Sequence, residues 1–243
     1  LIIARLYAER RFAHLPEAKR PGAIKNLIHA VSMPYVFTSD TTKFLARQLA
    51  EELGVTFVEL PINPEVAAGE DSMDFLATHL GLTVTPIAAQ NLQARTRGKI
   101  MWQWSNMAKG LWLQTGNMSE RAVGYTTVGG DLMGAYSLIG NLPKTVVIAL
   151  LGYIAGRHPW PAGKELLATK SSAELAEGQE DERDLMPFPV LDACYALFVG
   201  ERMAPREVLR TLRGMWSDGE LARMHPGFEP PLLKEWVQKF IRL

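Results

Sequence analysis

Two short apolar runs flank one amphipathic helix near the start of the chain, and this arrangement constrains the fold more than any other feature. The first run covers residues 27–33 and the second covers residues 55–62. Between them, Ser39 or Asp40 can cap a helix that Gly54 ends. Strand, helix and strand at this spacing predict a βαβ unit, and therefore a parallel sheet with right-handed crossovers.

Helical patterns recur along the rest of the chain, at residues 1–15, 85–110, 145–156, 190–199, 205–215 and 231–243. Two segments are expected to be loops, an acidic surface loop at residues 65–74 and a long mobile one at residues 158–183. The predicted class is α/β, a Rossmann-like parallel sheet with helices on both faces. All 243 residues are expected to form one domain, helical from about residue 187 onward.

Composition excludes several classes of function. Lys plus Arg equal Asp plus Glu at 26 each, which argues against a nucleic-acid partner or an anionic membrane surface. No apolar run approaches the ~20 residues of a membrane span, and a cytoplasmic location is the default expectation. The lone Cys194 excludes an internal disulfide and is predicted to be a buried, unreactive thiol. No metal-ligand spacing of histidines and no Ser-His-Asp or Cys-His arrangement is present.

The stretch from Gln90 to Lys144 carries most of the candidate chemistry. Its apolar run, residues 111–113, predicts a buried strand that leads into the polar residues 114–117, and a further helix can start directly after them. Ligands bind at the carboxyl ends of strands in open α/β sheets, and helix N-termini favour phosphates. Glu120 at that point is suited to a magnesium ion that bridges a phosphate. Lys144 is a cation able to reach phosphate oxygens.

The same residue types also have purely structural interpretations. Thr115 and Asn117 are common in turns, and a glutamate such as Glu120 stabilises the start of a helix without any ligand. Arg95 and Arg97 are either exposed arginines of a surface helix or a fork for phosphate and carboxylate groups. The pattern alone leaves these alternatives open.

Five segments, in this order, resemble the synthetase domain of NAD synthetases, most closely the glutamine-dependent branch: QNLQAR, TGNMSE, GYTTVGGD, IGNLPKT, and KSSAEL with the following QEDE. The resemblance covers roughly residues 26–199. It implies an adenine nucleotide alpha-hydrolase-like fold. It also implies a reaction in which ATP activates the nicotinate carboxylate of deamido-NAD as an adenylate and ammonia then displaces AMP.

The resemblance implies the following binding residues, and it assigns no residue as a general base. For ATP, as a co-substrate, they are Thr115, Lys144 and Ser172. For Mg²⁺ the ligand is Glu120. For deamido-NAD they are Asn91, Arg95, Glu120, Tyr125, Thr126, Thr127 and Val128.

Partners and subtype also follow from the resemblance. Val128 and Ala135 replace the lysine and aspartate of the small ammonia-dependent members, which favours glutamine as the ammonia source through an upstream glutaminase domain. A homodimer or higher homo-oligomer is implied, with Trp102, Trp104 and Trp112 in the core or at its interface. The family's S-G-G-x-D-S loop and its C-terminal Lys-Arg segment are absent. We therefore expect an incomplete domain that is inactive by itself.

Two alternatives remain open at this point. One is another ATP pyrophosphatase that amidates or thiolates a different carboxyl or carbonyl group. The other is a non-catalytic homologue that keeps the dimer scaffold and binds a nucleotide only as a regulator.

Overall fold

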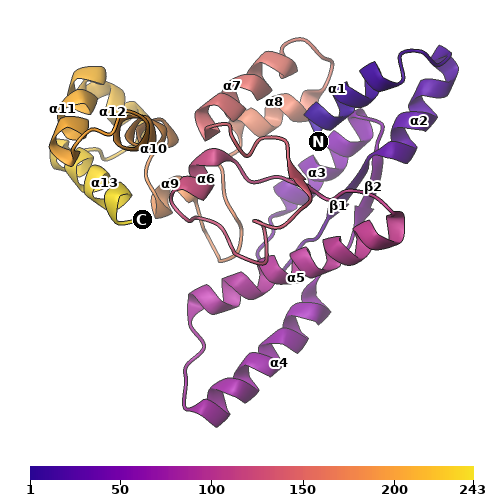
Figure 1. The fold of residues 1–243 in the computed structure, drawn as a ribbon, viewed down its shortest axis with the longest axis horizontal. Coiled ribbons are helices and arrows are strands. Elements are labelled where there is room, and N and C mark those ends of the chain that lie inside the picture. The colour runs from indigo at the N-terminus through magenta and orange to yellow at the C-terminus, as the bar shows by residue number, and fades with distance from the viewer.

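The computed structural model describes residues 1–243, and its first half is built on the predicted βαβ unit (Figure 1). Strand β1 (His29–Ser32) pairs in parallel with β2 (Thr56–Glu59), and helix α3 (Asp40–Glu52) connects them. The Ser39 side chain caps α3 by accepting a hydrogen bond from the Thr42 amide, as predicted. Gly54 adopts a φ of 62° directly after that helix, a conformation that glycine tolerates.

Helices cover both faces of this strand pair, which confirms the predicted fold class. Ala30 packs into an apolar cluster that includes Ala8, Ile24 and Ile154, from three different helices. The preceding residue, His29, points to the opposite face, as successive strand residues do. There its ring meets Trp104 of the long helix α5 edge-on, with centroids 5.7 Å apart.

The remaining elements complete the α/β arrangement. A second parallel pair joins β3 (Leu113–Gln114) to β4 (Tyr136–Ser137). The further helices, with one 3-10 turn and one π turn, are α1 (Ile2–Arg11), η1 (Glu17–Lys19), α2 (Arg20–Leu27), α4 (Asn63–Leu80), α5 (Pro86–Ala108), α6 (Met118–Ala122), α7 (Lys144–Ala155), α8 (Pro161–Ala168), α9 (Asp181–Asp184), α10 (Phe188–Tyr195), η2 (Ala196–Gly200), α11 (Pro205–Met215), α12 (Asp218–Met224) and α13 (Pro230–Arg242).

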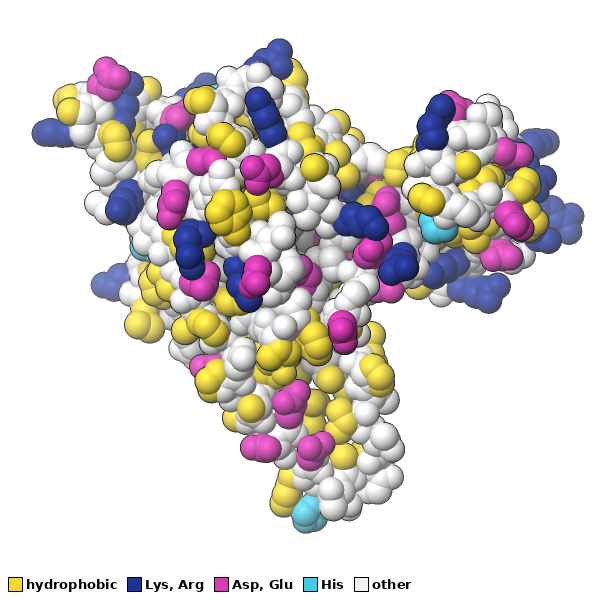
Figure 2. Space-filling model, turned by 180° about the vertical axis from the view of Figure 1, so that it is seen from behind, with side chains coloured by type: hydrophobic (Ala, Val, Ile, Leu, Met, Phe, Trp, Pro, Cys, Tyr) yellow, Lys and Arg dark blue, Asp and Glu magenta, His cyan; other side chains and the backbone are white.

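The C-terminal helices α10 to α13 gather into a lobe beside the strand-containing part (Figures 1 and 2). Their core includes Leu191, Leu212, Leu233 and Trp236, all buried. Cys194 is also buried there, and burial raises the pKa of its thiol to about 12. The predictions of a helical C-terminal part and of a buried thiol are confirmed.

Three local predictions are wrong. Residues 65–74 are not a loop but part of α4, because Pro64 lies in the first turn of that helix and the acidic residues lie on an exposed helical surface. Residues 158–183 include helices α8 and α9. Residues 111–113 are not a buried strand, since Leu111 is 75% exposed and only Leu113 joins a ladder.

Figure 1 shows α4 and α5 projecting side by side from the rest of the molecule. No helix of the chain is at once long enough and apolar enough to cross a membrane.

Candidate functional site

The site is built around helix α6, which places Glu120. Asn117 caps this helix by accepting a hydrogen bond from the Glu120 amide at 3.1 Å, and the Glu120 carboxylate accepts from the Asn117 amide at 3.3 Å. This capping box fixes the Glu120 side chain against its own helix start. Asn117 is buried, so its structural role at this position is established.

Lys144 faces Glu120 from the first residue of α7. Its Nζ atom lies 3.1 Å from Oε1 of Glu120, and both side chains are less than one-fifth exposed, at 18% and 19%. The same ammonium group lies 5.0 Å from the ring centroid of Phe188. An ammonium and a carboxylate held together in a partly dry setting interact more strongly than a surface pair.

A second carboxylate belongs to this cluster and was not assigned a role from the sequence. Asp181 is buried, and burial raises the pKa of its carboxyl group, while nearby Lys144 lowers it and Glu120 raises it. Asp181 lies within the QEDE segment, so the motif marked the region without identifying the residue. The Glu120–Lys144 pair therefore defines the centre of the site, and the charge of Asp181 interacts with both of its members.

The loop before Asp181 is fixed by hydrogen bonds within itself and to Tyr125. The Ser172 hydroxyl donates to the backbone carbonyl of Gln179 at 2.6 Å. The side-chain amide of Gln179 donates to the Tyr125 hydroxyl at 2.9 Å. Tyr125 in turn donates to Asp184 at 2.8 Å. Burial and the hydrogen bond to Asp184 raise the pKa of Tyr125, so it stays a neutral phenol.

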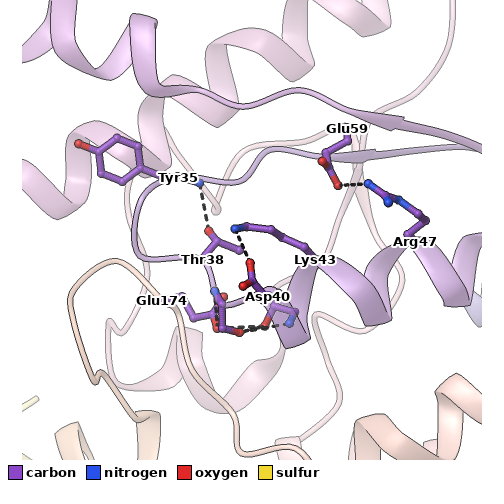
Figure 3. Close-up of polar contacts among 9 residues, drawn as sticks. Tyr35, Thr38, Asp40, Lys43, Arg47, Glu59 and Glu174 are labelled. Carbon is purple, nitrogen blue, oxygen red and sulfur yellow. Dashed lines mark hydrogen bonds and ion pairs between the residues drawn. The ribbon is translucent and has the colours of Figure 1, made fainter.

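The loop also reaches helix α3, as Figure 3 shows. Glu174 accepts hydrogen bonds from the Thr42 hydroxyl at 2.9 Å and from the Ser39 amide at 3.4 Å. Gln93 of α5 donates to the carbonyl of Leu175 at 3.0 Å. None of these loop contacts followed from the sequence, because they join residues more than 80 positions apart.

The predicted dinucleotide residues form a neighbouring group along α5. Asn91 accepts a hydrogen bond from Thr127 at 2.7 Å, and Arg95 donates to the carbonyl of Val128 at 3.1 Å. Thr126 is half-buried beside them. The structure thus brings together predicted residues from α5 and from the segment after α6, although Val128 itself is 75% exposed.

Thr115 and the two arginines complete the set. Thr115 is exposed and its side chain forms no hydrogen bond, so no side-chain contact connects it to the other predicted residues. Arg97 is partly buried and donates to the carbonyl of Met33 at 3.0 Å, whereas Arg95 is exposed. Burial lowers the pKa of Arg97, and nearby Glu174 raises it. Of the two arginines, Arg97 is therefore the one that faces the carboxyl end of β1.

The donor set of this centre fits a hard divalent cation. Glu120 and Asp181 would supply carboxylate oxygens, and the raised pKa of Asp181 comes in part from the negative charge of Glu120, which a bound cation would offset. No group of three or more acidic, histidine or cysteine side chains is arranged so that it could hold a metal ion. Magnesium commonly uses only one or two protein carboxylates and takes its other ligands from water and substrate phosphates.

A parallel βαβ unit with charged and hydroxyl side chains at the starts of α6 and α7 is an arrangement typical of nucleotide-binding α/β proteins. The family model described as NAD synthase matches residues 21–216. The chain belongs to the NAD synthase family.

Similar proteins and structures agree with this assignment. A glutamine-dependent NAD(+) synthetase of Acinetobacter baylyi is 33% identical over 217 residues, covering 89% of this chain and 36% of that protein. A glutamine-dependent NAD(+) synthetase structure from Cytophaga hutchinsonii matches with a TM-score of 0.72 at 24% identity, over 97% of this chain and 37% of the other, which supports the fold. The structure of a glutamine-dependent NAD+ synthetase from Acinetobacter baumannii in complex with ADP matches with a TM-score of 0.55 at 28% identity. This match covers 97% of this chain and 38% of the other. The chain thus spans about a third of the length of the curated relatives that it matches.

Proposed function

We propose that this chain is a single synthetase domain of a glutamine-dependent NAD synthetase, which forms NAD from deamido-NAD, ATP and ammonia. The observation that carries the proposal is the Glu120–Lys144 pair with Asp181 beside it, at the adjoining starts of two helices. The names of the relatives and their coverage of most of this chain support the same reaction.

The first half-reaction joins two anions, and its main requirement is the neutralisation and placement of negative charge. The nicotinate carboxylate attacks the α-phosphate of ATP, and pyrophosphate leaves. Lys144, Thr115 and Ser172 bind phosphate oxygens in this proposal. Magnesium, held by Glu120 and Asp181, supplies further charge neutralisation when it is bound.

The second half-reaction requires a positioned acyl group and little proton transfer by the protein. Ammonia adds to the adenylated carbonyl carbon, AMP leaves with the electron pair of its bond, and the added nitrogen releases one proton to solvent, which leaves the amide of NAD. Asn91, Arg95, Glu120 and the segment 125–128 hold the dinucleotide. In the proposal the ammonia comes from glutamine, through a glutaminase domain of the natural protein, and two copies of the chain associate as a homodimer.

The test is a turnover assay on the natural full-length protein, because these 243 residues contain no S-G-G-x-D-S segment. Deamido-NAD, ATP and magnesium are supplied with either ammonium or glutamine, and NAD and AMP are measured. We expect both products in equal amounts with either nitrogen source. Nucleotide binding without NAD under any condition would overturn the proposal in favour of a regulatory nucleotide-binding protein.

A further inference from the structure

Helix α7, which presents Lys144, begins without a cap from its own neighbourhood. Pro143 precedes it, and no local side chain accepts a hydrogen bond from its first turn. The first amide groups of a helix have no partner within that helix. Two of them are satisfied from elsewhere: Lys144 donates to the Ser119 hydroxyl at 2.7 Å, and Thr145 donates to the Asp192 carboxylate at 3.0 Å.

Asp192 also reaches the helix that carries Glu120. One of its oxygens accepts a hydrogen bond from the Ser119 hydroxyl, and the other accepts from the Thr145 hydroxyl at 2.6 Å as well as from the Thr145 amide. A single carboxylate therefore links α6 and α7 from a third helix, α10. Its negative charge also lies at the positive end of the α7 dipole.

The linked residues are the immediate neighbours of the site pair. Ser119 precedes Glu120, and Thr145 follows Lys144. Any shift of either helix start changes the 3.1 Å contact between Glu120 and Lys144. Helix α10 is itself fixed, because Phe188, Leu191 and Cys194 are buried in the core of the C-terminal lobe.

We propose that Asp192 is a positioning residue for the synthetase reaction: it aligns the starts of α6 and α7 so that Glu120 and Lys144 hold the nucleotide phosphates together. This inference rests on the proposed function. It also gives the C-terminal lobe a role in the site, since α10 supplies the carboxylate although no residue beyond the QEDE segment, residues 179–182, was predicted to take part.

The experiment is a double-mutant cycle in the natural full-length protein. Asp192→Asn is made in the wild-type and in the Lys144→Ala background, and kcat/KM for ATP is measured. The matched control is Cys194→Ala, which removes a buried atom from the same helix without touching the hydrogen bonds of Asp192. Thermal unfolding of all variants separates loss of activity from loss of stability.

We expect Asp192→Asn to lower kcat/KM about 100-fold in the wild-type background, because small misplacements of charged groups cost rates of that order. In the Lys144→Ala background the same change is expected to cost less than about threefold, since residues that act through one another are not additive. Cys194→Ala is expected to have the same effect in both backgrounds. If Asp192→Asn lowers kcat/KM by the same factor in the wild-type and the Lys144→Ala backgrounds, as the control is expected to, the positioning role is wrong.

Two further measurements distinguish a failed positioning role from a variant that does not fold and from a failed proposed function. If Asp192→Asn does not fold, Thr145→Val removes only the 2.6 Å hydroxyl contact and must show the same lack of additivity at smaller amplitude. If the wild-type protein forms no NAD, the proposed function fails. The affinity for ATP and magnesium is then measured by calorimetry for the same four proteins. Effects of Asp192→Asn and Lys144→Ala that are not additive support the positioning role, and additive effects contradict it.

Discussion

The Nζ atom of Lys144 lies 3.1 Å from the Oε1 atom of Glu120, although the two residues are 24 positions apart in the chain. Each belongs to the first turn of its own helix, and each helix start is fixed by hydrogen bonds outside that pair. The pair therefore does not depend on chance rotamers of two long side chains. In the proposed function, this pair is the site that receives magnesium-bound phosphate.

Loss of the lysine charge is expected to weaken nucleotide turnover and to leave the fold intact. Lys144→Ala should lower kcat/KM for ATP by about 100-fold, a typical effect of removing one group that stabilises developing charge. The control is Lys164→Ala, because Lys164 is exposed and forms no ion pair. Equal activity of the two variants would show that Lys144 does not contact the phosphates.

Asp181→Asn is expected to separate activity from stability. Burial raises the folded-state pKa of Asp181 above the unfolded value of 3.8, so the unfolded chain loses this proton first as pH rises. The free energy of unfolding therefore falls as pH rises from 3.8 through the folded-state pKa of Asp181, where the buried carboxyl group becomes charged. Asparagine removes the charge and can still accept the hydrogen bond from the Ala173 amide.

We expect Asp181→Asn to unfold at the same temperature as the wild type or higher, while the magnesium concentration needed for half-maximal activity rises by at least about tenfold. Thermal unfolding at pH 7 and a magnesium titration of NAD formation check both parts. A variant that is destabilised but keeps its magnesium dependence would contradict the proposal that Asp181 helps to hold magnesium.

Gly130 allows the segment that carries Thr127 to lie directly on α5. A Cβ atom at Gly130 would lie 2.9 Å from the backbone and from the Cβ atom of Ala94, which cannot move aside easily. Gly130→Ala should therefore destabilise the protein by about 1–3 kcal/mol and weaken deamido-NAD binding. Gly22→Ala is the control, because nothing lies within 4 Å of its Cβ position and alanine favours helix α2. Chemical denaturation measures the free energy of unfolding, and calorimetry measures the affinity for deamido-NAD.

The projecting α4–α5 hairpin exposes large apolar side chains near its turn, including Leu80 and Leu82, which are 65% and 64% exposed. Apolar atoms are also visible along this projection in Figure 2. Exposed apolar patches of this kind mark interaction surfaces, and the proposed homodimer would cover them. The double variant Leu80→Glu, Leu82→Glu should sediment as a monomer. The control is Val199→Glu, on the C-terminal lobe, where Val199 is 50% exposed; it should not change the sedimentation coefficient. If the double variant also sediments as a dimer, the interface lies elsewhere.

Local patterns in the sequence were sufficient for the elements whose signals are local. The cap at Ser39 forms, because this side chain bonds to the amide of Thr42, three residues away. The parallel pairing of β1 with β2 followed from the spacing of the βαβ unit alone. Family motifs then brought Glu120 and Lys144 into one candidate site.

Features that depend on tertiary contacts could not be predicted in this way. Helix α4 was missed because an acidic segment is as compatible with an exposed helix as with a loop. The exposure of Leu111 depends on which face the rest of the chain leaves uncovered. The contribution of Asp192 depends on a carboxylate that lies 47 residues from the helix it caps.

The central claim is tested most directly by NAD formation in the natural full-length protein and in its Glu120→Ala variant, with deamido-NAD, ATP, magnesium and saturating ammonium. Ammonium removes any dependence on glutamine hydrolysis, so the measurement reports the synthetase site alone. The account predicts NAD with the wild type and a loss of at least about 100-fold in the variant at unchanged thermal stability. NAD formed equally well by both proteins, or by neither, would contradict it.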